Sequence, residues 1–239
     1  YIPPTIAGIV LAYRGKLLAG GILTAFFIAL QIMSNHVQMS YYFLFVILFI
    51  AGAYFEDAWR NKTLPRFFKA SAVLLVAALI GVAANLSNLY HTYTYSKETM
   101  RGKSELVQTG DAAKQTSSGL DRDYITNWSY GIGETWTLLV PNFKGGSSSA
   151  PLSQSETAME KANPMYGSLY NSFPQYFGSQ PWTAGPVYVG AFVLFLFVLG
   201  CFIVKGPLKW ALLGATFFSI VLAWGKNFMP LTDFFIDYV

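Results

Sequence analysis

Hydrophobic and polar positions follow one another along this chain in long blocks. Apolar runs without a charged residue in their middle third cover residues 17–33, 39–55, 67–86, 187–204 and 208–224. A helix needs about 20 mainly apolar residues to cross a bilayer, with a range of about 17–25. The runs therefore predict about five membrane-spanning helices, three before and two after one long polar segment.

That polar segment divides the chain into three predicted parts. Residues 1–90 are expected to form N-terminal membrane helices, and residues 91–185 a large loop with short helices. Residues 186–239 are expected to form C-terminal membrane helices followed by an outer segment. The predicted fold class is an all-α polytopic membrane protein.

Prolines and glycines near the start of the chain indicate where a short helix begins and where two helices can pack closely. The apolar run 2–13 is too short to span a bilayer, and Pro3 and Pro4 can only open a helix because proline lacks the amide donor. We expect this run to end an upstream element or to pack as a short helix inside the protein. Gly20 and Gly21 mark a place where another backbone can approach closely.

Composition supports the membrane class. The chain is 54% hydrophobic and 12% charged, against about 25% charged in ordinary globular domains. The net charge of +4 comes from basic residues at the helix ends, so we expect no nucleic-acid partner and take the lipid bilayer as the surrounding phase. Cys201 is the single cysteine, which excludes an intrachain disulfide. The chain opens on Tyr1 rather than Met, and we expect an internal piece of a longer protein.

Charge in the connections predicts the orientation. Arg14 and Lys16, the basic connection at residues 56–69, and the turn with Lys205 and Lys209 fall on one side of a strict alternation of spans. Short cytoplasmic loops carry the excess of Lys and Arg, so this side is expected to be cytoplasmic. The loop 91–185 then lies outside the cytoplasm, in a multi-pass protein.

Known catalytic signatures do not appear in the sequence. It holds no phosphate-binding loop, no dinucleotide-binding glycine pattern and no G-x-S-x-G elbow. No metal ligands occur at a usual spacing. A divalent metal would therefore have no readable ligand set in this chain, and we predict no cofactor. The candidate functional residues are instead polar side chains at the outer ends of the helices.

Two polar clusters lie at these helix ends. His36 and Gln38 belong to an uncharged connection between two spans, where they either face a substrate cavity or simply cap a helix hairpin. Lys97 and Arg101 follow the third span and could hold a phosphate, since Arg suits bidentate phosphate contacts. The alternative for the second cluster is a solvated charged face.

A third cluster is aromatic. Glu134 is the lone acid in a stretch rich in glycine and aromatic residues, between Trp128 and Trp136, and Asn142 follows shortly after. Such a stretch is typical of a groove for carbohydrate or a lipid headgroup. The alternative is a structural loop that lies on the membrane. We expect Glu134 and Asn142 to contact sugar hydroxyls and the two tryptophans to stack beneath a ring or anchor in the interface.

Several stretches resemble the bacterial YfhO-type membrane proteins. They are residues 35–42 (NHVQMSYY), 95–102, 138–146 (with LLVPNF and a double glycine), 176–190 and 227–235. The resemblance covers nearly the whole chain. It implies a GT-C-like glycosyltransferase in the bacterial cytoplasmic membrane, which moves a sugar from a polyprenyl-phosphate carrier to a glycan or polymer acceptor at the outer face.

The resemblance also implies where catalysis is carried out. In GT-C enzymes the key acidic residue usually lies in the first outer loop, which places the general base upstream of Tyr1. We therefore assign no catalytic residue in this chain. Two alternatives remain open: a transporter or flippase for lipid-linked glycans, and a non-catalytic subunit that assembles with membrane protein partners.

Overall fold

The computed structural model describes residues 1–99 and 122–238. This part of the chain is mostly helical and contains no strand, only isolated β-bridges between Gly145 and Tyr176 and between Pro151 and Pro174. It divides into two compact units. The first comprises residues 1–99 and 204–216, and the second comprises residues 122–203 and 217–238. The predicted all-helical class is thus confirmed for the described residues.

The first unit is built from long apolar helices. They are α1 (Ile2–Tyr13), α2 (Leu17–Met33), α3 (Val37–Arg60), α4 (Leu64–Ala83) and α5 (Leu86–Ser96). Helix α2 packs closely on α1. A Cβ on Gly20 would lie 2.5 Å from the Ala12 nitrogen and 2.6 Å from the Gly8 carbonyl oxygen. The predicted close approach at Gly20 is therefore confirmed, and α1 is a short helix packed inside this unit.

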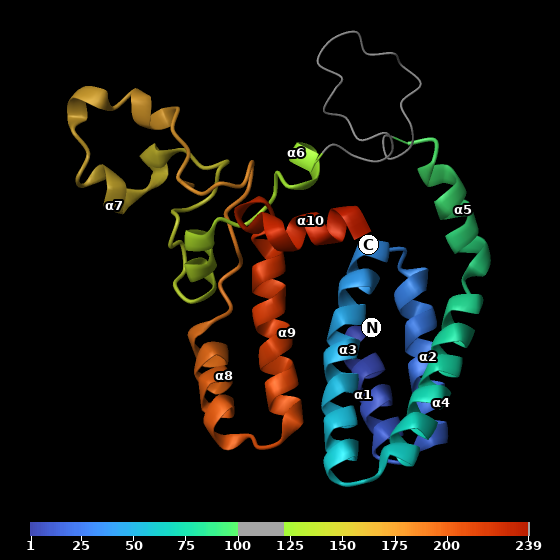
Figure 1. Cartoon of the computed structure of the whole chain (residues 1–239). Helices are drawn as coiled ribbons and strands as arrows, with labels where there is room; N and C mark the ends of the chain where they lie inside the picture. Colours follow the sequence, from blue (N-terminus) through green and yellow to red (C-terminus); the bar gives the residue numbers. More distant parts are fainter. Residues whose placement is uncertain (100–121, 239) are drawn as a thin grey trace. The chain divides into compact units, whose positions relative to one another are not determined.

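Helix α4 also packs against α2 (Figure 1). A Cβ on Gly81 would lie 2.8 Å from the Ala25 carbonyl oxygen, so these two backbones also touch. Just beyond α4, the side-chain amide of Asn85 donates to the carbonyls of Ala29 at 2.9 Å and Gly81 at 3.3 Å. Helix α4 ends at Ala83, before Asn85, so the predicted run 67–86 is interrupted there.

The second unit holds short helices followed by apolar ones. The short ones are α6 (Arg122–Ile125), η2 (Ile132–Leu138), η3 (Leu152–Gln154), α7 (Glu156–Met159), η4 (Pro164–Tyr166) and η5 (Leu169–Asn171). Then come α8 (Ala191–Ile203), α9 (Pro207–Ala223, with residues in both units), η6 (Gly225–Phe228) and α10 (Met229–Tyr238).

Helix α8 is shorter than the predicted run 187–204. It begins at Ala191 because Gly190 adopts φ +94°, a left-handed conformation that a helix cannot contain. Its 13 residues extend for about 20 Å, whereas a bilayer core is about 30 Å thick.

Two helices, α3 and α4, are each long and apolar enough to cross a membrane. Helix α9 and residues 225–238 reach that length only together, and the chain bends by 111° between them. Helices α1, α2 and α8 are apolar but shorter. The described residues thus contain two, or up to three, helices of spanning character, and the predicted number of five stays a prediction.

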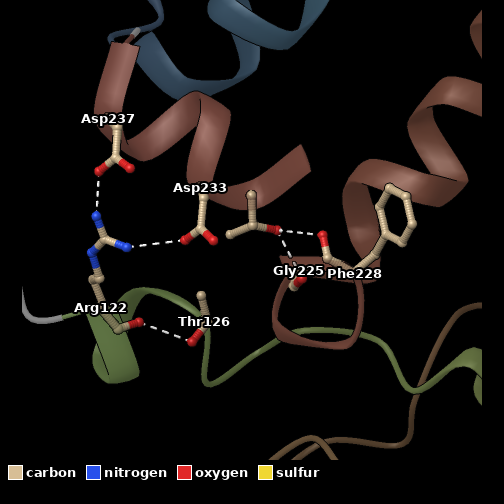
Figure 2. A network of polar contacts seen from close by, with 7 residues as sticks. Arg122, Thr126, Gly225, Phe228, Asp233 and Asp237 are labelled. Carbon is tan, nitrogen blue, oxygen red and sulfur yellow. Dashed lines mark hydrogen bonds and ion pairs between the residues drawn. The ribbon is translucent and has the colours of Figure 1, made fainter. Parts of the chain in front are cut away.

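Polar contacts attach α10 to α6. Arg122 lies between two carboxylates of α10 (Figure 2): one guanidinium nitrogen is 3.0 Å from Asp233, and another pairs with Asp237. The two aspartates are four residues apart, so they share one face of α10. At the start of α10, the Thr232 hydroxyl donates to the Gly225 carbonyl at 2.7 Å. These contacts hold the bend that follows α9.

Candidate functional site

Glu134 is the most buried acid of the second unit. Its side chain is in η2 and is 1% exposed. One carboxylate oxygen accepts from the amide of Ser179 at 3.0 Å and from the hydroxyl of Tyr176. The other accepts from the amide of Gly131, at the start of η2. The carboxylate therefore joins η2 to a turn more than forty residues further along the chain.

Tyr176 continues this network. Its hydroxyl, which donates to Glu134, accepts from the Gln180 amide at 3.2 Å. The Gln180 side chain in turn donates to the Trp128 carbonyl at 2.6 Å. Burial, together with the hydrogen bond to Glu134, raises the pKa of Tyr176 to about 12. The hydroxyl thus stays protonated and remains a donor at physiological pH.

Gly178 makes the contact between Glu134 and the turn at residues 176–180 sterically feasible. A Cβ on Gly178 would lie 1.7 Å from a Glu134 oxygen and 2.1 Å from the Tyr176 hydroxyl oxygen. A Cβ on Gly131 would lie 2.9 Å from the Ser179 hydroxyl oxygen. The turn at residues 176–180 can close over Glu134 only because position 178 has no side chain.

Helix η2 is also hydrogen-bonded to the ends of two apolar helices. The Val189 amide, just before α8, donates to the carbonyl of Leu138 at 3.2 Å. Just after α9, the indole nitrogen of Trp224 donates to the Thr135 hydroxyl at 2.8 Å. The segment before η2 is also hydrogen-bonded to the end of α9, because the Tyr130 amide donates to the Ala223 carbonyl at 2.8 Å. Helix η2 therefore lies where α8 begins and α9 ends.

Exposed aromatic rings surround η2. Trp136 is 55% exposed, and its ring centroid is 6.4 Å from that of Phe143, which is also about half exposed. Asn142 precedes Phe143 in a left-handed conformation at φ +56° and is exposed. Trp128 is 47% exposed. The second unit thus contains all four residues of the predicted aromatic cluster, three of them exposed and Glu134 buried.

Among these four, Glu134 is placed differently from the others. Sugar hydroxyls reach a carboxylate only if it faces an open surface, yet both oxygens of Glu134 already accept hydrogen bonds from the chain itself. Its observed role is to hold the segment together. Its predicted contact with a sugar stays a prediction, and Trp136 and Asn142 are the accessible members of the cluster.

The remaining predicted residues belong to the first unit or lie outside the described residues. His36 and Gln38 are exposed at the start of α3, and Lys97 lies over the ring of Tyr93 at 4.4 Å from its centroid. Arg101 lies outside the described residues. Their predicted roles at a shared substrate cavity stay predictions.

An apolar groove of about 480 Å³ opens between α2 and α4 in the same unit. Leu18, Ile22 and Phe26 line one wall, and Val76 and Ile80 line the other. Neither His36 nor Gln38 lines this groove. Its walls can pack against apolar chains, but none of its lining residues has a polar side chain that could take part in a reaction.

Sequence reasoning missed the residues that enclose Glu134. Tyr176, Gly178 and Gln180 belong to residues 176–190, but no local pattern in the sequence connects that stretch to Glu134. Lys144 belongs to residues 141–146, which the sequence assigns to the aromatic cluster, but no pattern in the sequence indicates a role of its own for this lysine. Among the described residues, no group of three or more potential ligands could hold a metal ion.

Comparison with known proteins adds no identification. No family model, no curated protein and no solved structure matches this chain.

Proposed function

We propose that this chain is part of a GT-C-like membrane glycosyltransferase of the YfhO type. Such a protein would transfer a sugar from a polyprenyl-phosphate donor to a glycan or polymer acceptor at the outer face of the bacterial cytoplasmic membrane. The proposal rests on the sequence resemblance and on one structural observation: η2, with the exposed Trp136, is hydrogen-bonded to residues at the ends of the apolar helices α8 and α9.

This placement suits a donor that is half lipid and half sugar. The ends of apolar helices lie near the bilayer surface, where a phosphate stays wet while its prenyl chain stays in hydrocarbon. An exposed indole at that depth offers a flat apolar face to a sugar ring. The Glu134 network fixes the backbone that carries this indole. The general base would come from a segment upstream of Tyr1.

The test is transfer from a labelled polyprenyl-phosphate sugar by a membrane protein that contains this chain. Trp136→Ala and Arg101→Ala should each lower turnover at least about tenfold, if the ring stacks on the sugar and the guanidinium pairs with phosphate. Met165→Ala is the matched control, because Met165 is 77% exposed on η4. Turnover that is equal in all three variants and the wild type would contradict the assignment.

One observation favours a second candidate, a transporter for lipid-linked glycans. The chain bends by 111° between α9 and α10, and broken helices are common at the substrate sites of transporters. A transporter would move a fluorescent lipid-linked glycan across a sealed vesicle without cleaving it. If the protein neither transfers the sugar nor moves the lipid-linked glycan, the third alternative applies, in which the chain is a non-catalytic subunit of a membrane protein complex.

A further inference from the structure

Lys144 occupies an unusual position on the surface of η2. Its side chain lies across Gly133: a Cβ on this glycine would be 3.4 Å from the Lys144 Cε and 3.5 Å from its Nζ. Because side chains three residues apart eclipse one another in a 3₁₀ helix, Gly133 and Trp136 share one face of η2. Lys144 and Phe143 therefore cover the same face, one over Gly133 and the other against Trp136.

The backbone at Lys144 is fixed. Its carbonyl accepts from the Phe177 amide at 2.8 Å, next to the bridge between Gly145 and Tyr176. Phe177 is 65% exposed, and its ring lies against Gly145, 3.3 Å from a Cβ placed there. We call the set of Trp136, Phe143, Lys144 and Phe177 the Lys144 surface. It combines one cation with three exposed aromatic rings.

The ammonium of Lys144 takes part in none of the ion pairs formed among the described residues. Glu134 is the acidic residue of η2, but its two carboxylate oxygens already accept hydrogen bonds from Gly131, Tyr176 and Ser179. A half-buried cation that pairs with no carboxylate in the described part of the chain favours an anionic ligand. The three exposed aromatic rings of Trp136, Phe143 and Phe177 favour a ligand that also brings apolar surface.

The position of the Lys144 surface, next to the start of α8 and the end of α9, indicates the source of that anion. Helix η2 is hydrogen-bonded to Val189 before α8 and to Trp224 after α9, and α8 contains no charged residue. With α8 and α9 embedded in a bilayer, as the proposed function requires, the place where α8 begins and α9 ends would lie at the level of the lipid headgroups, where aromatic rings and lysines anchor proteins. The anion found at this level is a lipid phosphate.

We propose that the Lys144 surface binds the phosphate of an anionic membrane lipid, with Lys144 as the cation and the three rings inserted beside the glycerol and upper acyl chain. The proposal depends on the membrane location of α8 and α9 and does not require sugar transfer. A lipid-linked sugar phosphate is one ligand of this class, and phosphatidylglycerol is the probe for the class as a whole.

The experiment uses a protein containing this chain in phosphatidylcholine nanodiscs. A photoactivatable phosphatidylglycerol with its reactive group in the headgroup is crosslinked, and the peptide that contains residues 133–144 is quantified by mass spectrometry. Lys144→Gln should lower its labelling about fivefold, which corresponds to about 1 kcal/mol for one lysine at a charged membrane surface. Lys144→Arg should retain the labelling. Lys161→Gln, an exposed lysine beyond α7, should leave it unchanged.

Three outcomes would overturn the proposal. One is equal labelling of the wild type and Lys144→Gln, and another is equal labelling by a phosphatidylcholine probe, which carries no net charge. The third is competition by inorganic phosphate as effective as that by unlabelled phosphatidylglycerol, which would identify a site for free phosphate. Loss of labelling in Lys144→Gln with retention in Lys144→Arg excludes misfolding as the cause. Sugar transfer is measured separately, so its failure leaves this result intact.

Discussion

Tyr176 donates its hydroxyl hydrogen bond to Glu134, a residue 42 positions earlier in the chain. This contact closes the turn at residues 176–180 over η2 and buries the carboxylate almost completely. Trp136 lies on η2 and Phe177 on this turn, so the contact joins the two segments that carry these exposed rings.

Glu134→Gln should destabilise the protein by about 1–3 kcal/mol, because a buried donor or acceptor without a partner carries that cost. The carboxylate accepts from Gly131, Tyr176 and Ser179, and the amide group of glutamine would face at least one of these donors. The measurement is denaturant unfolding in detergent micelles. Glu160→Gln is the control, since Glu160 is exposed. Equal midpoints for both variants would contradict a structural role of Glu134.

Tyr176 should ionise only in strongly alkaline solution, because burial and the bond to Glu134 raise its pKa to about 12. Its ordinary pKa of 10.0 applies to the unfolded chain. The hydrogen-bonded phenol therefore stabilises the fold fully below pH 10.0, and this contribution is lost as the pH rises through about 12. Tyrosinate absorbance of the wild type minus that of Tyr176→Phe gives the titration. A midpoint near that of free tyrosine would refute the buried contact.

Gly178→Ala should open the turn over Glu134. The added methyl would lie 1.7 Å from a Glu134 oxygen, which the packing cannot absorb, and overpacking typically costs about 1–3 kcal/mol. Limited proteolysis of the segment at residues 176–180 should become faster. Gly167→Ala is the matched control, because its nearest neighbour would be the Pro164 carbonyl oxygen at 3.4 Å. If both variants are cleaved at the same rate, the turn does not depend on position 178.

Gly20→Ala should separate α1 from α2, because the new methyl would lie 2.5 Å from the Ala12 nitrogen and 2.6 Å from the Gly8 carbonyl. The thermal midpoint in detergent should fall by several degrees, as expected for a loss of about 1–3 kcal/mol. Gly52→Ala in α3 meets nothing within 4 Å and should leave the midpoint unchanged or slightly higher. If the thermal midpoint falls as much in Gly52→Ala as in Gly20→Ala, the loss of stability does not come from the close packing of α1 on α2.

The predicted topology can be tested by cysteine labelling of intact cells. In a Cys201→Ser background, an impermeant thiol reagent should label Lys161→Cys in the predicted outer loop. It should label Lys62→Cys, in the basic turn between α3 and α4, only after the cells are opened. Labelling of Lys62→Cys alone in intact cells would mean that the orientation is inverted.

Local sequence patterns were sufficient for the apolar helices and some of their contacts. Hydrophobicity depends on each residue and its neighbours, so the runs that became α2, α3 and α4 were readable without tertiary information. The same holds for Gly20, because a small residue in an apolar helix permits close packing wherever its partner comes from. The aromatic cluster around η2 was visible for the same local reason.

Tertiary structure decided how these pieces are used. The sequence could not assign Tyr176 to Glu134 or Lys144 to Gly133, because each pair meets only after the chain has folded back on itself. It also could not give the 111° bend after α9, which is held by contacts such as that of Arg122 with Asp233. Apolar burial is a property of a residue, whereas a hydrogen bond or ion pair needs two groups at a set distance. The sequence therefore determined the apolar helices of the described residues, two or three of which have spanning character, and the fold alone determined which polar residues face one another.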